Sequence, residues 1–223
     1  MTIYNIMIWF QWCCMLLSFI FSIRTINNNS IPSYMRGFYI YSLLALCLCS
    51  LSVINLLTGH INFHYLVIIQ KLSLIFHYSF LSYFIYGTFT NRKVKLFFTP
   101  IFFSFLCLIL ISLVDNLYEI DTFHTNAITN LALVFYCLIY YYQLFNKPPV
   151  EILLEEPSFW MVSGLFLSLT ITVPINSLRH FLINHISEDF NFEIVSISVF
   201  AYGTMHLFFV KAYLCSIHKK IVS

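Results

Sequence analysis

The stretch LFFTPIFFSFLCLILISLV, from Leu96 to Val114, decides the fold class of this chain. It carries no charged residue, and its length is close to the roughly 20 apolar residues with which an α-helix crosses the hydrocarbon core of a bilayer. A basic cluster, Asn91-Arg92-Lys93-Val94-Lys95, precedes it, whereas the loop at 115–126 contains acidic residues and neither lysine nor arginine. This pattern predicts a transmembrane helix whose basic end lies in the cytoplasm.

The composition of the whole chain agrees with a membrane protein. Of its 223 residues, 60% are hydrophobic and 9% are charged, against about 25% charged in an ordinary soluble domain. A surface that faces water cannot be built from so few charges. The length accommodates seven helices with short connections and no soluble domain of ordinary size, so we expect a single membrane domain.

Apolar segments recur along the sequence and predict an all-α bundle of seven transmembrane helices. The connection at 59–64 is short enough to make its flanking helices antiparallel neighbours. The first segment lacks the basic start and the small-residue cleavage pattern of a signal peptide, so we expect it to form the first helix. Pro100 and Pro174 could kink their helices. The approximate helix ranges are 3–23, 38–58, 65–89, 96–114, 127–145, 159–183 and 192–216.

The distribution of lysine and arginine predicts the orientation of the bundle. Basic residues near helix ends stay on the cytoplasmic side of a membrane. The first, third and fifth loops and the C-terminal tail contain eight of them, and the loops on the opposite side contain none. We therefore expect the N-terminus outside and the C-terminus in the cytoplasm. The eight residues are Arg24, Arg36, Arg92, Lys93, Lys95, Lys147, Lys219 and Lys220.

Several classes of function find no support in the sequence. The eleven lysines and arginines are dispersed, which does not suit nucleic acid as a partner. The spans contain no carboxylate pair, and the chain has no metalloprotease motif, nucleophile elbow or glycine-rich phosphate loop, so we predict a non-enzymatic protein. The seven cysteines lie in apolar stretches, where a thiol acts as a small hydrophobe, so neither a disulfide nor a zinc site is expected.

Charged residues inside predicted spans are candidates for a binding site, because a charge in hydrocarbon is unfavourable unless it faces the bundle interior. Lys71, Arg179 and His180 lie within two turns of the outer helix ends, and Glu193 lies at the outer start of the last helix. Together they predict an outward-facing pocket of net positive charge for an anionic or carbonyl-bearing small ligand. The alternative is that these side chains extend to the outer interface.

His77 and His206 are both expected near the middle of the bilayer, and if their helices are neighbours the two rings converge. Convergent imidazoles can be axial haem ligands, a metal pair or a proton-sensitive hydrogen-bond switch. The simpler alternative is that each ring hydrogen-bonds to an adjacent helix. We keep both as candidate ligand-binding residues and expect no cofactor. Lys211 lies too near the cytoplasmic end to be a retinal-binding lysine.

The stretch Glu155-Glu156-Pro157-Ser158-Phe159-Trp160-Met161-Val162-Ser163-Gly164 and the last-helix sequence Ala212-Tyr213-Leu214-Cys215 resemble poorly characterised seven-helix membrane proteins of Bacteroidetes-type bacteria. This resemblance implies a sensory or accessory module in the bacterial inner membrane. Because the sequence stops soon after the last helix, it also implies a signal that passes to a separate partner protein through the cytoplasmic loops or within the membrane.

Three hypotheses for function follow from the sequence. The first is a non-enzymatic sensor or accessory subunit that responds to a small ligand or to the state of the membrane. The second is a small transporter or channel, although only five glycines and no midplane acids are present. The third is a structural subunit of a larger membrane complex.

Overall fold

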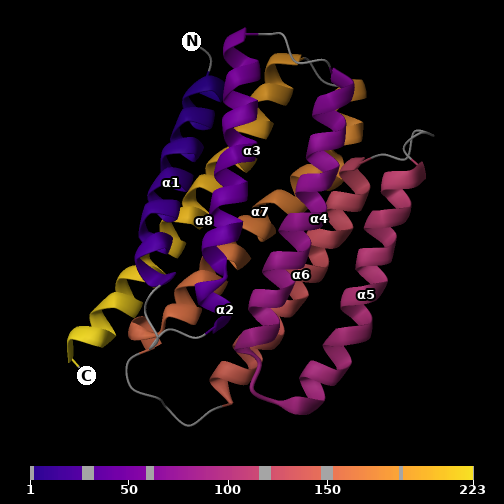
Figure 1. Cartoon of the computed structure of the whole chain (residues 1–223). Coiled ribbons are helices and arrows are strands. Elements are labelled where there is room, and N and C mark those ends of the chain that lie inside the picture. Colours follow the sequence, from indigo (N-terminus) through magenta and orange to yellow (C-terminus); the bar gives the residue numbers. More distant parts are fainter. Residues whose placement is uncertain are drawn as a thin grey trace.

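The computed structural model describes residues 3–26, 33–58, 63–115, 122–146, 153–185 and 188–222, with side chains at 3–24, 34–51, 53–54, 71–111, 125–146, 153–178 and 193–217. Throughout these residues the chain is helical and contains no strand. Seven long helices alternate in direction along the bundle, and two short helices lie at one end of it (Figure 1). The long helices are α1 (Ile3–Ile26), α3 (Phe38–Thr58), α4 (Phe63–Thr88), α5 (Arg92–Asp115), α6 (Thr122–Phe145), α7 (Pro157–His185) and α8 (Glu188–Val222).

Most helices extend a turn or so beyond the ranges that hydropathy predicts. Helix α5 begins at Arg92 rather than near residue 96, because Asn91 caps it: the Lys93 amide donates to Asn91 Oδ1 at 2.9 Å. Helix α7 begins at Pro157, where the fixed φ of proline suits the first helical turn. Hydropathy detects the part of a helix inside hydrocarbon, whereas these helices continue through the interface. The predicted loops also contain α2 (Ser33–Arg36) and the short 3₁₀ helix η1 (Leu153–Glu155).

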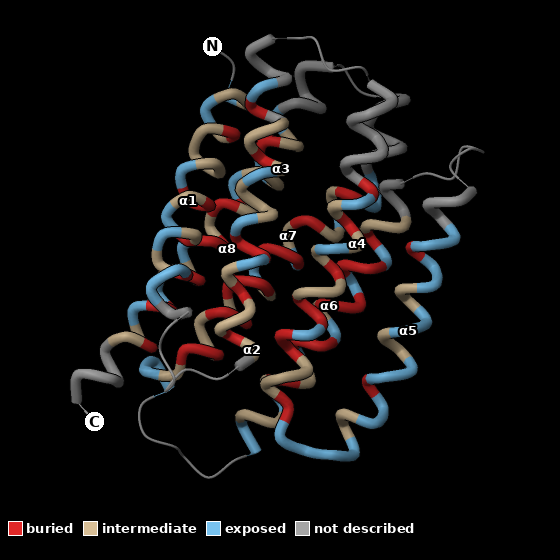
Figure 2. The backbone as a smooth tube through the Cα atoms, in the orientation of Figure 1, coloured by how far each residue is buried: buried red, intermediate tan, exposed pale blue. Residues whose placement is uncertain are grey.

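Six stretches of the described chain are long and apolar enough to cross a membrane, which identifies a multi-pass membrane protein. They lie in six of the seven long helices; in the remaining one, α4, the structure describes side chains only from Lys71 onward. Many large apolar residues are exposed along the bundle, and Figure 2 shows the exposed positions of each helix in pale blue. Such a surface is suited to lipid and not to water. The six stretches are Ile3–Arg24, Tyr34–Leu51, Arg92–Ile111, Thr125–Phe145, Pro157–Leu178 and Glu193–Ile217.

Six of the long helices close into a ring. Helix α1 packs against α3, α3 against α4, α4 against α6, α6 against α7, α7 against α8, and α8 against α1. Helix α5 packs against α4 and α6 and lies outside this ring (Figure 1). Its outward face carries Leu96, Phe97 and Phe103, each more than half exposed. The interior of the ring is therefore built without α5.

Two glycines allow the closest helix contacts in the ring. A Cβ atom at Gly164 of α7 would overlap the Cβ of Phe208 on α8 and lie 3.2 Å from the Met205 carbonyl oxygen. A Cβ atom at Gly203 of α8 would lie 2.8 Å from the Phe10 ring of α1. Small residues at such crossings let helix backbones approach, which is how membrane helices gain packing energy.

Aromatic side chains fill the ring toward the end where α1 and α8 finish. Phe38 of α3 stacks edge-on against Phe209 of α8 at 5.0 Å and against Phe84 of α4 at 5.5 Å. All three rings are at most 2% exposed. These three residues form an aromatic layer between α3, α4 and α8.

Candidate functional site

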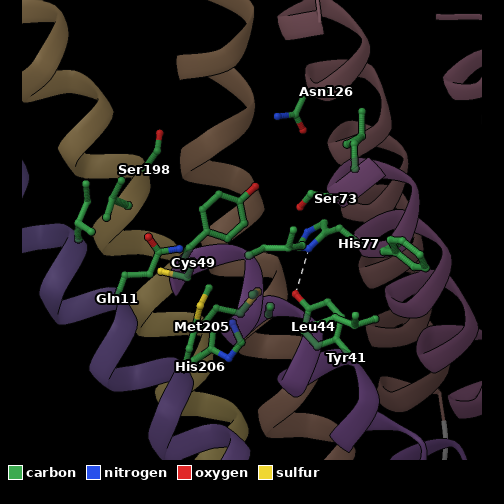
Figure 3. Close-up of a pocket in the computed structure, with 18 of the residues that line it drawn as sticks. Gln11, Tyr41, Leu44, Cys49, Ser73, His77, Asn126, Ser198, Met205 and His206 are labelled. Atoms are coloured by element: carbon green, nitrogen blue, oxygen red, sulfur yellow. Dashed lines mark hydrogen bonds between the residues drawn. The ribbon is translucent and has the colours of Figure 1, made fainter. Parts of the chain in front are cut away.

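A cavity of about 370 Å³ lies inside the ring, in the half above the aromatic layer (Figure 3). Its described walls come from all six ring helices, with the largest contributions from α1, α3, α4 and α8. A volume of this size holds a small organic molecule. The polar residues that line it are Tyr4, Gln11, Tyr41, Ser73, His77, Asn126, Asn176, Ser198, Tyr202 and His206.

Helical spacing places these polar side chains on one face of each helix. Ser198, Tyr202 and His206 recur every four residues along α8, and Ser73 and His77 are four residues apart on α4. Residues separated by four positions project from the same side of a helix, one turn above another. A ladder of hydroxyl and imidazole groups therefore runs down two walls of the cavity.

Tyr41 connects the two histidines at the floor of the cavity. Its hydroxyl and His77 Nδ1 share a hydrogen bond of 3.0 Å between α3 and α4, drawn as a dashed line in Figure 3. Its ring lies nearly parallel to that of His206, with centroids 6.2 Å apart and an interplanar angle of 6°. His77 and His206, which come from helices far apart in the sequence, thus contact the same tyrosine.

The imidazole nitrogens at this floor are incompletely hydrogen-bonded. His206 is 0% exposed, and neither of its ring nitrogens has a partner in the described part of the chain. His77 Nε2 and the Ser198 hydroxyl also have none there. A buried polar group without a partner destabilises a protein by about 1–3 kcal/mol, so unpaired groups beside a cavity favour a ligand that supplies hydrogen bonds.

The cavity carries no formal charge among its described lining residues. Amides, hydroxyls and imidazoles alternate with apolar side chains such as Ile8, Leu48 and Val199. No cluster of three or more metal-ligating side chains occurs in the described residues. Such a lining is suited to an uncharged molecule with one or two hydrogen-bonding groups.

Of the four residues that the sequence grouped into an outer pocket, the structure describes the side chains of two, and neither lines the cavity. Lys71 is buried, at 6% exposure, but it is not among the lining residues. Glu193 is exposed and also outside the lining. The side chains of Arg179 and His180 lie outside those that the structure describes.

Other residues of the cavity were not identified from the sequence. Tyr41 and Tyr202 are two of fifteen tyrosines, and nothing in the sequence alone distinguishes them. Gln11 and Asn176 are of residue types that usually form hydrogen bonds between membrane helices, yet both line the cavity. The four-residue spacing of Ser198, Tyr202 and His206 is the one signal that could have indicated a polar face on α8.

Comparisons with protein-family models, with curated proteins and with solved structures gave no match.

Proposed function

We propose that this chain is a non-enzymatic membrane sensor or accessory subunit that binds a small uncharged ligand in the cavity and acts through a separate protein partner. The observation that carries the proposal is the pair of unpartnered nitrogens of His206, fully buried beside a cavity of ligand size. A ligand that hydrogen-bonds to His206 and His77 relieves that unfavourable state and thereby stabilises one arrangement of the helices.

Tyr41 provides a way for occupancy to change the bundle. Its ring covers His206 while its hydroxyl is hydrogen-bonded to His77, so a ligand that reaches His206 displaces Tyr41 from that hydrogen bond. One turn earlier on α3, Phe38 packs against Phe209 in the aromatic layer. A shift of α3 at Tyr41 is thus transmitted to the end of the bundle where Arg24 and Lys95 lie.

The proposal includes seven spans, with the N-terminus outside and the C-terminus in the cytoplasm of a bacterial inner membrane. Two features support α4 as the seventh span. It is about 39 Å long at 1.5 Å per residue, and it packs beside α3 and α6 over its described length. The end of α1, helix α2, the start of α5 and the end of α8 carry seven of the eight lysines and arginines, and they lie at the same end of the bundle (Figure 1). The resemblance to Bacteroidetes-type seven-helix proteins is consistent with this assignment.

Cysteine labelling tests both the seventh span and the orientation. In a cysteine-free background, His60→Cys and Asn91→Cys flank α4. We expect a membrane-impermeant maleimide to label position 60 in intact cells and position 91 only after permeabilisation, because α4 places them on opposite sides. Labelling of both positions from the same side would show that α4 does not cross, and the reverse pattern would invert the orientation.

Purification from the native membrane in mild detergent tests the function itself. We expect mass spectrometry of the intact complex to find one uncharged small molecule per chain together with a protein partner. His206→Phe should lose the small molecule, whereas Leu207→Phe, which enlarges the exposed neighbouring position, should keep it. The partner should remain with both variants, because its contacts lie elsewhere.

Two results would overturn the proposal. A haem absorption band that disappears in His77→Phe and His206→Phe would make these residues haem ligands instead. A chain that carries no small molecule, and whose melting temperature in detergent does not respond to added hydrophobic alcohols, would remove the basis for a ligand-binding cavity.

A further inference from the structure

We infer that the start of α5 and the end of α6 form a binding surface for anionic phospholipids. This inference goes beyond the proposed function and depends on neither the cavity nor its ligand. It follows from the charge at this end of the two helices, from the contacts that join them, and from the exposure of the apolar side chains beside the charge. The α5–α6 surface consists of Arg92, Lys93, Lys95, Leu96, Phe97, Tyr142 and Phe145.

Three basic residues lie at the start of α5, and neither helix carries an acid near them. Arg92 and Lys93 are exposed, and the ammonium group of Lys95 lies over the Tyr86 ring, 5.1 Å from its centroid. The single acid of α5, Asp115, is its last residue and lies at the opposite end, and α6 contains no acid. The α5–α6 surface therefore has an uncompensated positive charge.

The end of α6 lies beside the start of α5. The backbone amide of Thr90, two residues before α5, donates a hydrogen bond to Gln143 Oε1 of α6 at 3.3 Å. One turn further along α5, the centroids of the Phe98 and Tyr136 rings are 4.2 Å apart. Both helix ends lie at the end of the bundle where α1 and α8 finish (Figure 1). A lipid at this position has both helices within reach.

The basic residues are followed directly by the most exposed apolar side chains of the described chain. Leu96 and Phe97 of α5 are 73% and 60% exposed, Tyr142 and Phe145 of α6 are 72% and 74% exposed, and no other large apolar side chain there exceeds 56%. Arg92 lies only about 6 Å before Leu96 along the axis of α5. The cations are thus at the depth of lipid phosphates, and the apolar side chains are at the depth of the first acyl carbons.

An anionic phospholipid combines the two properties that this surface recognises. Its phosphate carries a net negative charge, whereas the choline group of phosphatidylcholine neutralises the phosphate beside it. Each lysine or arginine near an anionic lipid surface strengthens binding about fivefold. An acidic peptide would also be attracted to the cations, but it would leave Leu96 and Phe97 uncovered, because these side chains lie on the hydrocarbon side of the charge.

Native mass spectrometry of the detergent-solubilised protein tests the inference, with phosphatidylglycerol and phosphatidylcholine of the same acyl chains as probes. We expect phosphatidylglycerol to bind about tenfold more tightly. Arg92→Gln/Lys93→Gln should weaken its binding about tenfold or more and leave phosphatidylcholine binding unchanged. The control Arg24→Gln/Lys211→Gln also removes two exposed cations, from α1 and α8 at the same end of the bundle, and should change binding less than about twofold.

A second pair of variants tests the apolar part of the surface. Leu96→Ala should weaken phosphatidylglycerol binding about threefold, because it removes apolar area that the acyl chains cover. Leu108→Ala changes a half-exposed position three turns further along the same helix and should leave binding unchanged. Millimolar inorganic phosphate should not displace the lipid, whereas raising the salt concentration should weaken its binding.

Each part of the inference has its own contrary result. Equal binding of the two lipids would overturn the preference for anionic lipid, and equal losses in the two double variants would overturn the location at α5 and α6. Displacement by inorganic phosphate, or unchanged binding in Leu96→Ala, would overturn a lipid as the ligand. Thermal melting shows whether each variant is folded, and Lys93→Gln alone, with an expected loss of about fivefold, replaces a double variant that is not. None of these results bears on the cavity or on the proposed function.

Discussion

Gly164→Val should strongly destabilise the folded protein. The new Cβ would overlap the Cβ of Phe208, and this atom cannot move away by a side-chain rotation because it is attached directly to the backbone of α8. Helices α7 and α8 would have to separate, and overpacking of this kind destabilises a protein by about 3 kcal/mol. For a chain of this size that corresponds to a fall of about 6–12 °C in melting temperature.

Size-exclusion chromatography after heating in detergent measures the effect of Gly164→Val. Thr170→Leu serves as the control, since it enlarges an exposed position about a turn and a half further along the same helix. We expect the control to melt within about 2 °C of the wild type. If Gly164→Val melted at the wild-type temperature, the close approach of α7 and α8 in the structure would be incorrect.

His206→Phe should have opposite effects on stability and on ligand binding. In the ligand-free protein it removes two buried nitrogens that have no partner in the described residues, and the adjoining cavity accommodates the larger ring. We expect the free energy of unfolding to rise by about 1–3 kcal/mol and the ligand to be lost. Functional sites typically contain residues whose replacement makes the protein more stable.

The melting temperature of ligand-free protein, with and without the substitution, decides between two roles of His206. A rise supports a residue kept for binding. A fall of several degrees would mean that the imidazole is hydrogen-bonded in the membrane and contributes to packing, which is the simpler alternative that the sequence also allows. Leu207→Phe again serves as the control, and its melting temperature should not change.

The sequence predicted much of the architecture, and the structure adds what hydropathy cannot measure. Uninterrupted apolar segments such as 96–114 identify helices that cross a membrane, because the thickness of hydrocarbon sets their length. The same signal does not record where a helix stops outside the hydrocarbon, so α8 extends from Glu188 to Val222 rather than over 192–216. It also does not indicate that α5 lies outside the ring, since hydropathy carries no information on which helices are neighbours.

The site was harder to predict because sequence position gives depth along a helix but not direction around the bundle. Depth alone grouped Lys71 with an outer pocket, yet its side chain is buried and is not among the residues that line the cavity. The same reasoning placed His77 and His206 at one depth, and in the structure both imidazole rings contact Tyr41. To predict the direction in which a side chain points, one must know which helices are neighbours in the bundle.

The uncharged lining of the cavity has a consequence for what this protein can sense. Moving one elementary charge through a transmembrane voltage of 100 mV changes its free energy by about 2.3 kcal/mol, but a neutral ligand bound among neutral side chains moves none. Under the proposed function, occupancy by an uncharged ligand is therefore the same in an energised and a de-energised cell, and it does not follow the ionic strength outside. A sensor built in this way would respond to the amount of its ligand and not to the electrical state of the membrane.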